Sequence, residues 1–156
     1  MKTGFLSLVS FLLFGFLLSF TLGCNQQNDC CINIDVAVSI HYQNQEGKNL
    51  INSSAEFDAS NIKIYYKKED EFVYEVKGNL GYPNFHTIED RDGATVLTVF
   101  ASYYYEGNKS TTLIELNPNV KDTLVCAFDL SNHNEVITNA WLNGNPVNRQ
   151  LIVIKK

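Results

Sequence analysis

The chain has 156 residues, 45% of them hydrophobic, and carries 12 basic against 17 acidic side chains, for a formal net charge of −5. Lysine and arginine are scattered along it rather than clustered, so this composition argues against a nucleic-acid partner, which is held through its phosphates. The length fits one domain with a single hydrophobic core.

The first two dozen residues follow the pattern of an export signal. Lys2 gives a short positive region, and residues 5–20 are an apolar run interrupted only by serine and glycine. Residues 21–24, Thr-Leu-Gly-Cys, then end the run with small residues and a cysteine. This order predicts cleavage close to Cys24 and export of the rest of the chain.

A cysteine directly after Gly23 resembles the lipobox of bacterial lipoproteins, in which the thiol is acylated and the chain is cut just before it. The resemblance implies a signal peptide over residues 1–23, acyl chains such as palmitate on Cys24, and a short tether over residues 24–30. Two alternatives stay open, an ordinary signal peptide with an incidental cysteine and a retained membrane span of about 20 residues. The span lacks the positive cluster that usually comes after it.

The lipobox resemblance also implies a location in the bacterial cell envelope. The membrane is then a partner through the lipid anchor. Asn25, rather than aspartate, comes directly after the cysteine, which disfavours inner-membrane retention by the enterobacterial rule. We therefore expect the outer membrane and leave open which of its faces the domain occupies.

Residues 32–42 carry the clearest structural signal. Apolar side chains alternate with mostly polar ones from Ile32 to Tyr42. A period of two over this length predicts one half-buried strand.

The rest of the chain predicts further strands and no amphipathic helix. These strands are expected at residues 62–66, 72–76, 85–88, 95–105, 111–116, 123–130, 136–142 and 151–154. The pairs Asp92-Gly93 and Asn143-Gly144 are typical of hairpin turns. Strands every eight to twelve residues or so favour an all-β fold. We expect an immunoglobulin-like, two-sheet antiparallel β-sandwich of about eight or nine strands over residues 31–156, after an N-terminal signal helix.

Four short features also resemble small uncharacterised lipoproteins of Bacteroidetes bacteria. They are the pair Cys30-Cys31, the alternating strand directly after it, Gly47 with Leu50-Ile51, and Trp141 with Asn143-Gly144. The resemblance implies a β-sandwich anchored in an envelope membrane, and it implies no known activity.

The tyrosines are candidate ligand contacts. Adjacent tyrosines on a strand face opposite ways, so one of each pair is expected at the surface, where its ring can stack on a sugar or contact a protein. The candidates are Tyr65, Tyr103, Tyr104 and Tyr105. The alternative is that tyrosine is present because it favours strands.

The cysteines left after Cys24 allow one disulfide. Cys30 shares strand parity with Ile32, and Cys126 shares it with Leu124, so both thiols are expected on buried faces. This parity predicts a Cys30–Cys126 bond, which would stabilise by about 4 kcal/mol on the chain-entropy account. The alternative is that Cys126 is a small buried apolar residue.

Other chemistry-bearing residues point to no cofactor or metal and to no catalytic centre. The histidines His41, His86 and His133 are far apart in sequence, and residues 89–93 read as an acidic hairpin turn more than as a calcium loop. No recognisable nucleophile or phosphate-binding motif is present. Asp122-Thr123-Leu124 resembles the acceptor of the Bacteroidetes O-glycosylation system, which implies a glycan on Thr123.

These features together predict a membrane-anchored envelope lipoprotein whose domain is a non-enzymatic interaction or structural module. A glycan-binding accessory lipoprotein that uses exposed tyrosines is the first alternative. A small envelope hydrolase is the second.

Overall fold

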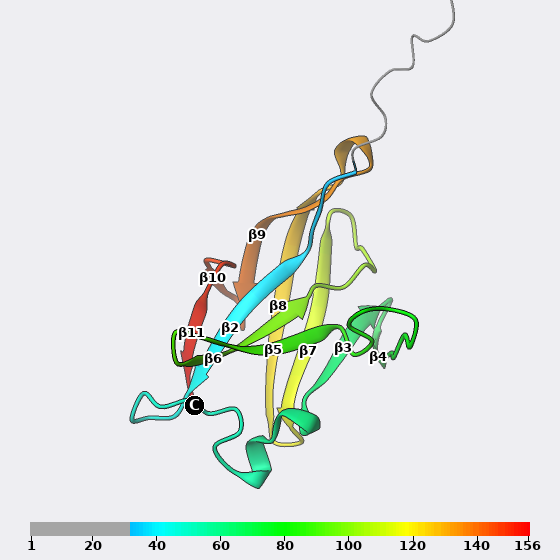
Figure 1. The fold of residues 1–156 in the computed structure, drawn as a ribbon. Helices are drawn as coiled ribbons and strands as arrows, with labels where there is room; N and C mark the ends of the chain where they lie inside the picture. The colour runs from blue at the N-terminus through cyan, green and yellow to red at the C-terminus, as the bar shows by residue number, and fades with distance from the viewer. Residues whose placement is uncertain (1–31) are drawn as a thin grey trace, which may run out of the picture. The chain divides into compact units, whose positions relative to one another are not determined.

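A computed structural model describes residues 32–156, which form eleven strands and three short 3-10 helices (Figure 1). The first strands are β1 (Ile34–Asp35), β2 (Ala37–Gln43), β3 (Lys63–Lys68), β4 (Glu71–Tyr74), β5 (His86–Arg91) and β6 (Ala94–Phe100). The later strands are β7 (Lys109–Asn117), β8 (Val120–Asp129), β9 (Glu135–Leu142), β10 (Asn145–Val147) and β11 (Ile152–Lys155). The short helices are η1 (Ala55–Phe57), η2 (Ala59–Asn61) and η3 (Ser131–His133).

The N-terminal predictions lie outside the described residues. They are the signal helix, the lipidated Cys24, the tether and Cys30. Within residues 32–156, the structure contains no helix long and apolar enough to cross a membrane.

The strands form two sheets that pack face to face. The seven-stranded sheet has the order β1-β9-β8-β7-β3-β4, with β10 also paired to β9, and the four-stranded sheet has the order β11-β2-β6-β5. Figure 1 shows β2, β6 and β5 crossing in front of β7 and β8. The core between the layers includes Ile64 and Leu124 from one sheet and Ile40 and Leu97 from the other, each at most 1% exposed. The predicted all-β class and its sandwich-like packing are confirmed.

The prediction of an entirely antiparallel sandwich is wrong in two places. β1 runs parallel to β9, and β11 runs parallel to β2. Both pairings involve strands near the ends of the described chain. No hairpin turn connects these strands to their partners, so nothing local forces an antiparallel direction. The strand number also exceeds the prediction, because β1 and β10 have only two and three residues, too few to show a period.

The alternating stretch at residues 32–42 is divided between the two sheets. The ladder breaks at Val36, with β1 in the seven-stranded sheet and β2 in the four-stranded sheet. In β2, Val38, Ile40 and Tyr42 are fully buried, as their parity predicted, whereas Ile34 is 62% exposed. The prediction of one continuous buried face is therefore wrong for Ile34, because the chain changes sheets before β2 begins.

The strand predicted over residues 95–105 ends at Phe100. The Ala101 amide still donates to the Val36 carbonyl at 2.9 Å, but residues 102–105 leave the ladder: the Ser102 amide donates to Thr112 Oγ1 at 2.9 Å, and the Tyr104 amide donates to Ser102 Oγ at 3.1 Å. The segment 101–105 therefore presents its three tyrosines from a loop rather than on alternate faces of a strand.

Candidate functional site

An apolar pocket of about 280 Å³ lies where the segments 75–85 and 101–105 meet the starts of β2 and β9. Six of its eleven lining residues are aromatic, and Glu135 is the charged one. The lining consists of Val36, Tyr66, Leu80, Gly81, Tyr82, Phe85, Phe100, Ala101, Tyr103, Tyr105 and Glu135. Such a concave, mostly apolar surface with few polar groups is the usual form of a ligand site.

Contacts between the rings hold the wall of the pocket. Tyr66 is buried on β3, and its ring centroid lies 4.8 Å from that of Phe85 and 5.3 Å from that of Tyr103. Its hydroxyl donates to the Phe100 carbonyl at 2.8 Å. Tyr82, which is 54% exposed, stacks on Phe100 with centroids 5.2 Å apart. Tilted, edge-on and offset-stacked pairs are the favoured aromatic geometries, so the wall is pre-formed.

Glu75 fixes the tyrosine loop from the segment directly after β4. Its carboxylate accepts hydrogen bonds from the hydroxyls of Tyr103 and Tyr104, the latter at 2.6 Å. Donation by Tyr103 and then Tyr104 holds the pKa of Glu75 below its usual value, so this carboxylate stays ionised. Lys77 lies on the same segment, with its ammonium 4.2 Å from the Tyr103 ring centroid.

Tyr105 supplies an unused polar group at the pocket. Its hydroxyl is buried beside the Glu135 carboxylate and makes no hydrogen bond of standard geometry among residues 32–156. Burial, followed by the charge of Glu135 and a hydrogen-bonding interaction with its carboxylate, raises the pKa of Tyr105 to about 12, so the phenol keeps its proton at neutral pH. A buried hydroxyl without a partner is unfavourable, and a ligand that pairs with it would remove that cost.

The structure separates the tyrosines that the sequence grouped. Tyr103 and Tyr105 line the pocket, and Tyr104 bonds Glu75 beside it. Tyr65 points to the opposite side of its sheet and contacts Tyr74, with centroids 5.5 Å apart. The sequence did not identify Tyr66, Phe85 and Phe100 as pocket residues, because aromatic residues in or beside strands are typical of the core. The high density of aromatic residues over residues 100–105 was the one signal in the sequence that indicated a pocket.

The outward side of the seven-stranded sheet is a second aromatic surface. Tyr74, Tyr65, Leu113 and Thr123 are successive partners across β4, β3, β7 and β8. On the neighbouring row, Val125 of β8 pairs with Trp141 of β9. We call this surface the outer face and define it by Phe72, Tyr74, Tyr65, Leu113, Val125 and Trp141, all exposed or half-buried.

Two predicted modification sites lie on β8. Thr123 is half-buried on the outer face, and the preceding Asp122 is 1% exposed and bonded inside the domain. Cys126 is 1% exposed in the core, and burial raises the pKa of its thiol to about 12. The glycan on Thr123 and the Cys30–Cys126 bond stay predictions, the latter because Cys30 lies outside the described residues.

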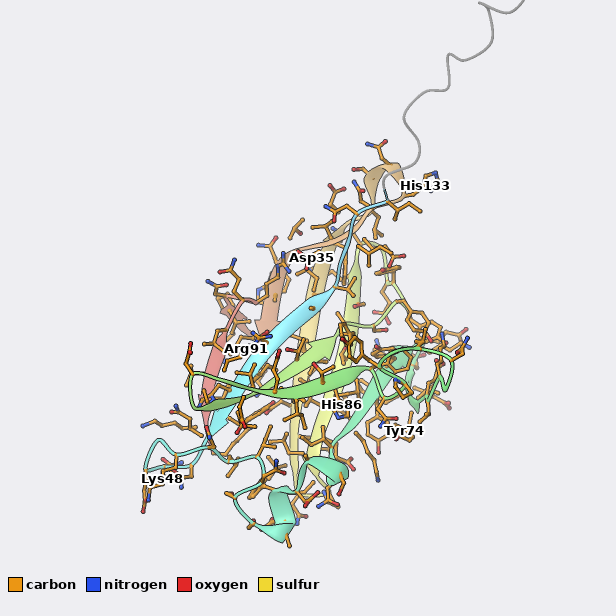
Figure 2. All side chains as sticks on the ribbon, in the orientation of Figure 1. Asp35, Lys48, Tyr74, His86, Arg91 and His133 are labelled. Atoms are coloured by element: carbon orange, nitrogen blue, oxygen red, sulfur yellow. The ribbon has the colours of Figure 1, made fainter. Side chains whose placement is uncertain are left out.

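The histidines do not converge. Figure 2 places His133 at the end of the domain where β1 begins, well away from His86 on β5. His41 is buried, with its Nδ1 3.2 Å from the Thr95 carbonyl. Within residues 32–156, no three His, Cys, Asp or Glu side chains are placed to hold a metal ion.

The acidic stretch at residues 89–93 is the hairpin between β5 and β6. Glu89 pairs with Arg91, and Asp90 accepts a hydrogen bond from the Thr95 hydroxyl at 2.9 Å. Asp92 and Gly93 both take positive φ, at 51° and 82°, as the Asp-Gly signal predicted. The Glu89 and Asp90 carboxylates therefore have partners within the hairpin.

No protein-family model, curated protein or solved structure matches this chain.

Proposed function

We propose that this chain is an exported, lipid-anchored protein of the bacterial cell envelope whose β-sandwich is a non-enzymatic binding module. The order of residues up to Cys24 supports the anchor. The binding role rests on one observation, the aromatic pocket beside Tyr105.

The size and lining of the pocket favour recognition of one compact chemical group. At about 280 Å³ it lies just below the usual range for whole small ligands and suits a ring or a branched alkyl group. Its aromatic wall supplies apolar contact, and the Tyr105 hydroxyl supplies one oriented polar contact. Many apolar contacts with one or two placed polar groups are typical of binding rather than of acid–base chemistry.

The outer face supports a second candidate, glycan binding. Tyr65 and Tyr74 form an aromatic pair on a sheet surface that also carries Trp141. Exposed aromatic rings on such a surface can stack on sugar rings. This candidate uses Tyr65 as the sequence predicted, with Tyr74 and Trp141 in place of residues 103–105.

The neutral probe 3,3-dimethylbutan-1-ol tests the pocket, because it combines a branched alkyl group with one hydroxyl. We expect calorimetry on the full-length protein in non-ionic detergent to detect binding at up to about 10 mM probe. Ala101→Phe, which places a ring in the pocket, should abolish binding, and Tyr74→Ala on the outer face should not. Unchanged binding by Ala101→Phe, with the fold verified by circular dichroism, would contradict the proposal.

The same two variants test glycan binding. If the protein retains an envelope oligosaccharide on an array, Tyr74→Ala should remove that signal and Ala101→Phe should keep it. The reverse pattern would assign the sugar to the pocket and exclude the outer face as its site.

A further inference from the structure

We propose that the group recognised by the pocket is an organic cation, a methylated ammonium such as that of choline. The inference rests on the proposed binding role of the pocket and adds the chemical class of the ligand. It is carried by the ring faces, by Glu135 and by the position of Lys77.

The aromatic rings of the pocket favour a positively charged ligand. The face of an aromatic ring is electrostatically negative, and several rings around one space attract a cation, most strongly when water is excluded. Six rings line this pocket, and those of Tyr66, Phe85 and Tyr103 contact one another in its wall. A quaternary ammonium presents methyl groups to such a wall, so its charge is accommodated without a shell of hydrogen bonds.

The protein already places a cation of its own on these rings. The Lys77 ammonium lies 4.2 Å from the Tyr103 centroid and 5.8 Å from the Phe85 centroid, both within cation–π range. Lys77 itself is exposed. Two rings of the pocket wall therefore attract positive charge in this structure.

The charged group of the lining has the matching sign. Glu135 begins β9 and is the charged residue among those that line the pocket. Its carboxylate acts on the neighbouring Tyr105, whose buried hydroxyl makes no hydrogen bond of standard geometry in the protein and can turn to a polar atom of the ligand. The Glu135 carboxylate would repel an anionic ligand, whereas it attracts a cationic one. The formal net charge of −5 attracts the same class of ligand over longer distances.

A neutral sugar fits this lining less well than a cation does. A hexose carries several hydroxyls that need partners once they leave water. Two of the tyrosine hydroxyls in the lining are already bonded within the protein, which leaves the side-chain polar groups of Glu135, Tyr105 and Tyr82 beside the aromatic wall. Methyl groups with one dispersed charge need fewer partners, so the pocket suits them better.

Choline and 3,3-dimethylbutan-1-ol have nearly the same shape and differ in charge, so the pair isolates the cation. On the full-length protein in non-ionic detergent, we expect choline to bind about fivefold or more tightly than the neutral compound. Glu135→Gln should remove most of that preference. Glu46→Gln is the matched control, because Glu46 is exposed and pairs with Lys48 at the end of the domain away from His133 (Figure 2).

Lys77→Met gives an independent readout. It removes a positive charge that repels a second cation and competes for the same rings, so the variant should bind choline at least about twofold more tightly than the unaltered protein does. The neutral compound should be unaffected. Weaker choline binding by this variant would contradict the inference.

The outcomes separate the inference from the proposed function. Equal affinity for choline and the neutral compound, both lost in Ala101→Phe, would overturn the cation and keep the pocket as a binding site. Failure of both compounds to bind the unaltered protein would overturn both. A choline preference that survives Glu135→Gln undiminished would exclude Glu135 from recognition and overturn the inference as stated.

Discussion

The Tyr42 hydroxyl donates a hydrogen bond of 2.9 Å to the Asp122 carboxylate and so joins β2 of one sheet to β8 of the other through the core. Both side chains are at most 1% exposed. The other oxygen of Asp122 accepts from Asn143 Nδ2 at 2.6 Å and from the Lys156 ammonium at 2.5 Å. The buried charge is therefore paired, as a carboxylate at this depth requires.

Asp122→Ala should lower the free energy of unfolding by about 3 kcal/mol, because it leaves the buried Tyr42 hydroxyl without its acceptor and removes the partner of Lys156. Asp70→Ala, in the exposed turn between β3 and β4, is the matched control and should change stability by less than about 0.5 kcal/mol. Urea titration measures both. Equal midpoints for the two variants would show that Asp122 is not a structural link.

Alkaline pH should unfold the domain through its buried tyrosines. Burial raises the pKa of Tyr42 and Tyr66 well above the ordinary value, and that of Tyr105 to about 12. Because these folded-state values exceed the unfolded one, the stabilisation is complete below about pH 10 and is lost as pH rises toward 12. Denaturant midpoints measured from pH 8 upward should fall in that window. Ionisation of every tyrosine near pH 10 in the folded protein, monitored by absorbance, would contradict this.

Local patterns predicted the parts of this fold that depend on near neighbours. The β3–β4 hairpin and the Asn143-Gly144 turn were read from the sequence, and both residues of that turn take positive φ. The parallel pairing of β1 with β9 could not be read from the sequence, because a two-residue strand shows no period and its partner lies about a hundred residues away. The pocket was missed for a related reason. Residues 102–105 leave the sheet, with bonds to Thr112 and Glu75 that no sequence periodicity indicates.

The thiol of Cys126 decides between the two interpretations of the cysteines. Asn33 is held beside β9 by the hydrogen bond of the Glu135 amide to its carbonyl at 2.9 Å, whereas Cys126 is level with Ala140 further along that strand. Three residues separate Cys30 from Asn33 in sequence, whereas five separate Glu135 from Ala140 along β9, which favours the interpretation of Cys126 as a buried apolar residue.

We therefore expect Cys126 to be a free thiol that reacts with iodoacetamide only on unfolding, as its raised pKa and burial imply. Mass spectrometry after labelling with and without urea measures this. A Cys30–Cys126 peptide in a non-reducing digest would contradict the free thiol and establish the disulfide that strand parity predicts.

The short strand β1 should depend on one ion pair. Arg149 donates to both carboxylate oxygens of Asp35, at 2.7 and 2.5 Å, and these hydrogen bonds hold the pKa of Asp35 below its ordinary value. Because the pKa of Asp35 is lower in the folded state, the stabilisation from this pair is complete above the unfolded-state pKa near 4. It is lost as the pH falls through the folded-state pKa.

Arg149→Lys, which keeps the charge but not the paired geometry, should cost about 0.5–1 kcal/mol because the pair is partly exposed. It should also make the backbone amide of Asp35, the β1 amide that the parallel ladder directs at β9, exchange faster with solvent, as measured by NMR. Unchanged protection of β1 in this variant would show that its backbone pairing with β9 is sufficient.

The central claim, that the domain is held at a membrane through Cys24, is tested most directly by the intact mass of the protein extracted from membranes of an expressing bacterium. The account predicts a chain that begins at Cys24 and carries acyl chains, each contributing about 0.8 kcal/mol of membrane affinity per buried CH₂. Cys24→Ser should give an uncleaved, unacylated chain. A wild-type mass that corresponds to a chain beginning at Met1, or to a chain with an unmodified Cys24, would contradict the claim.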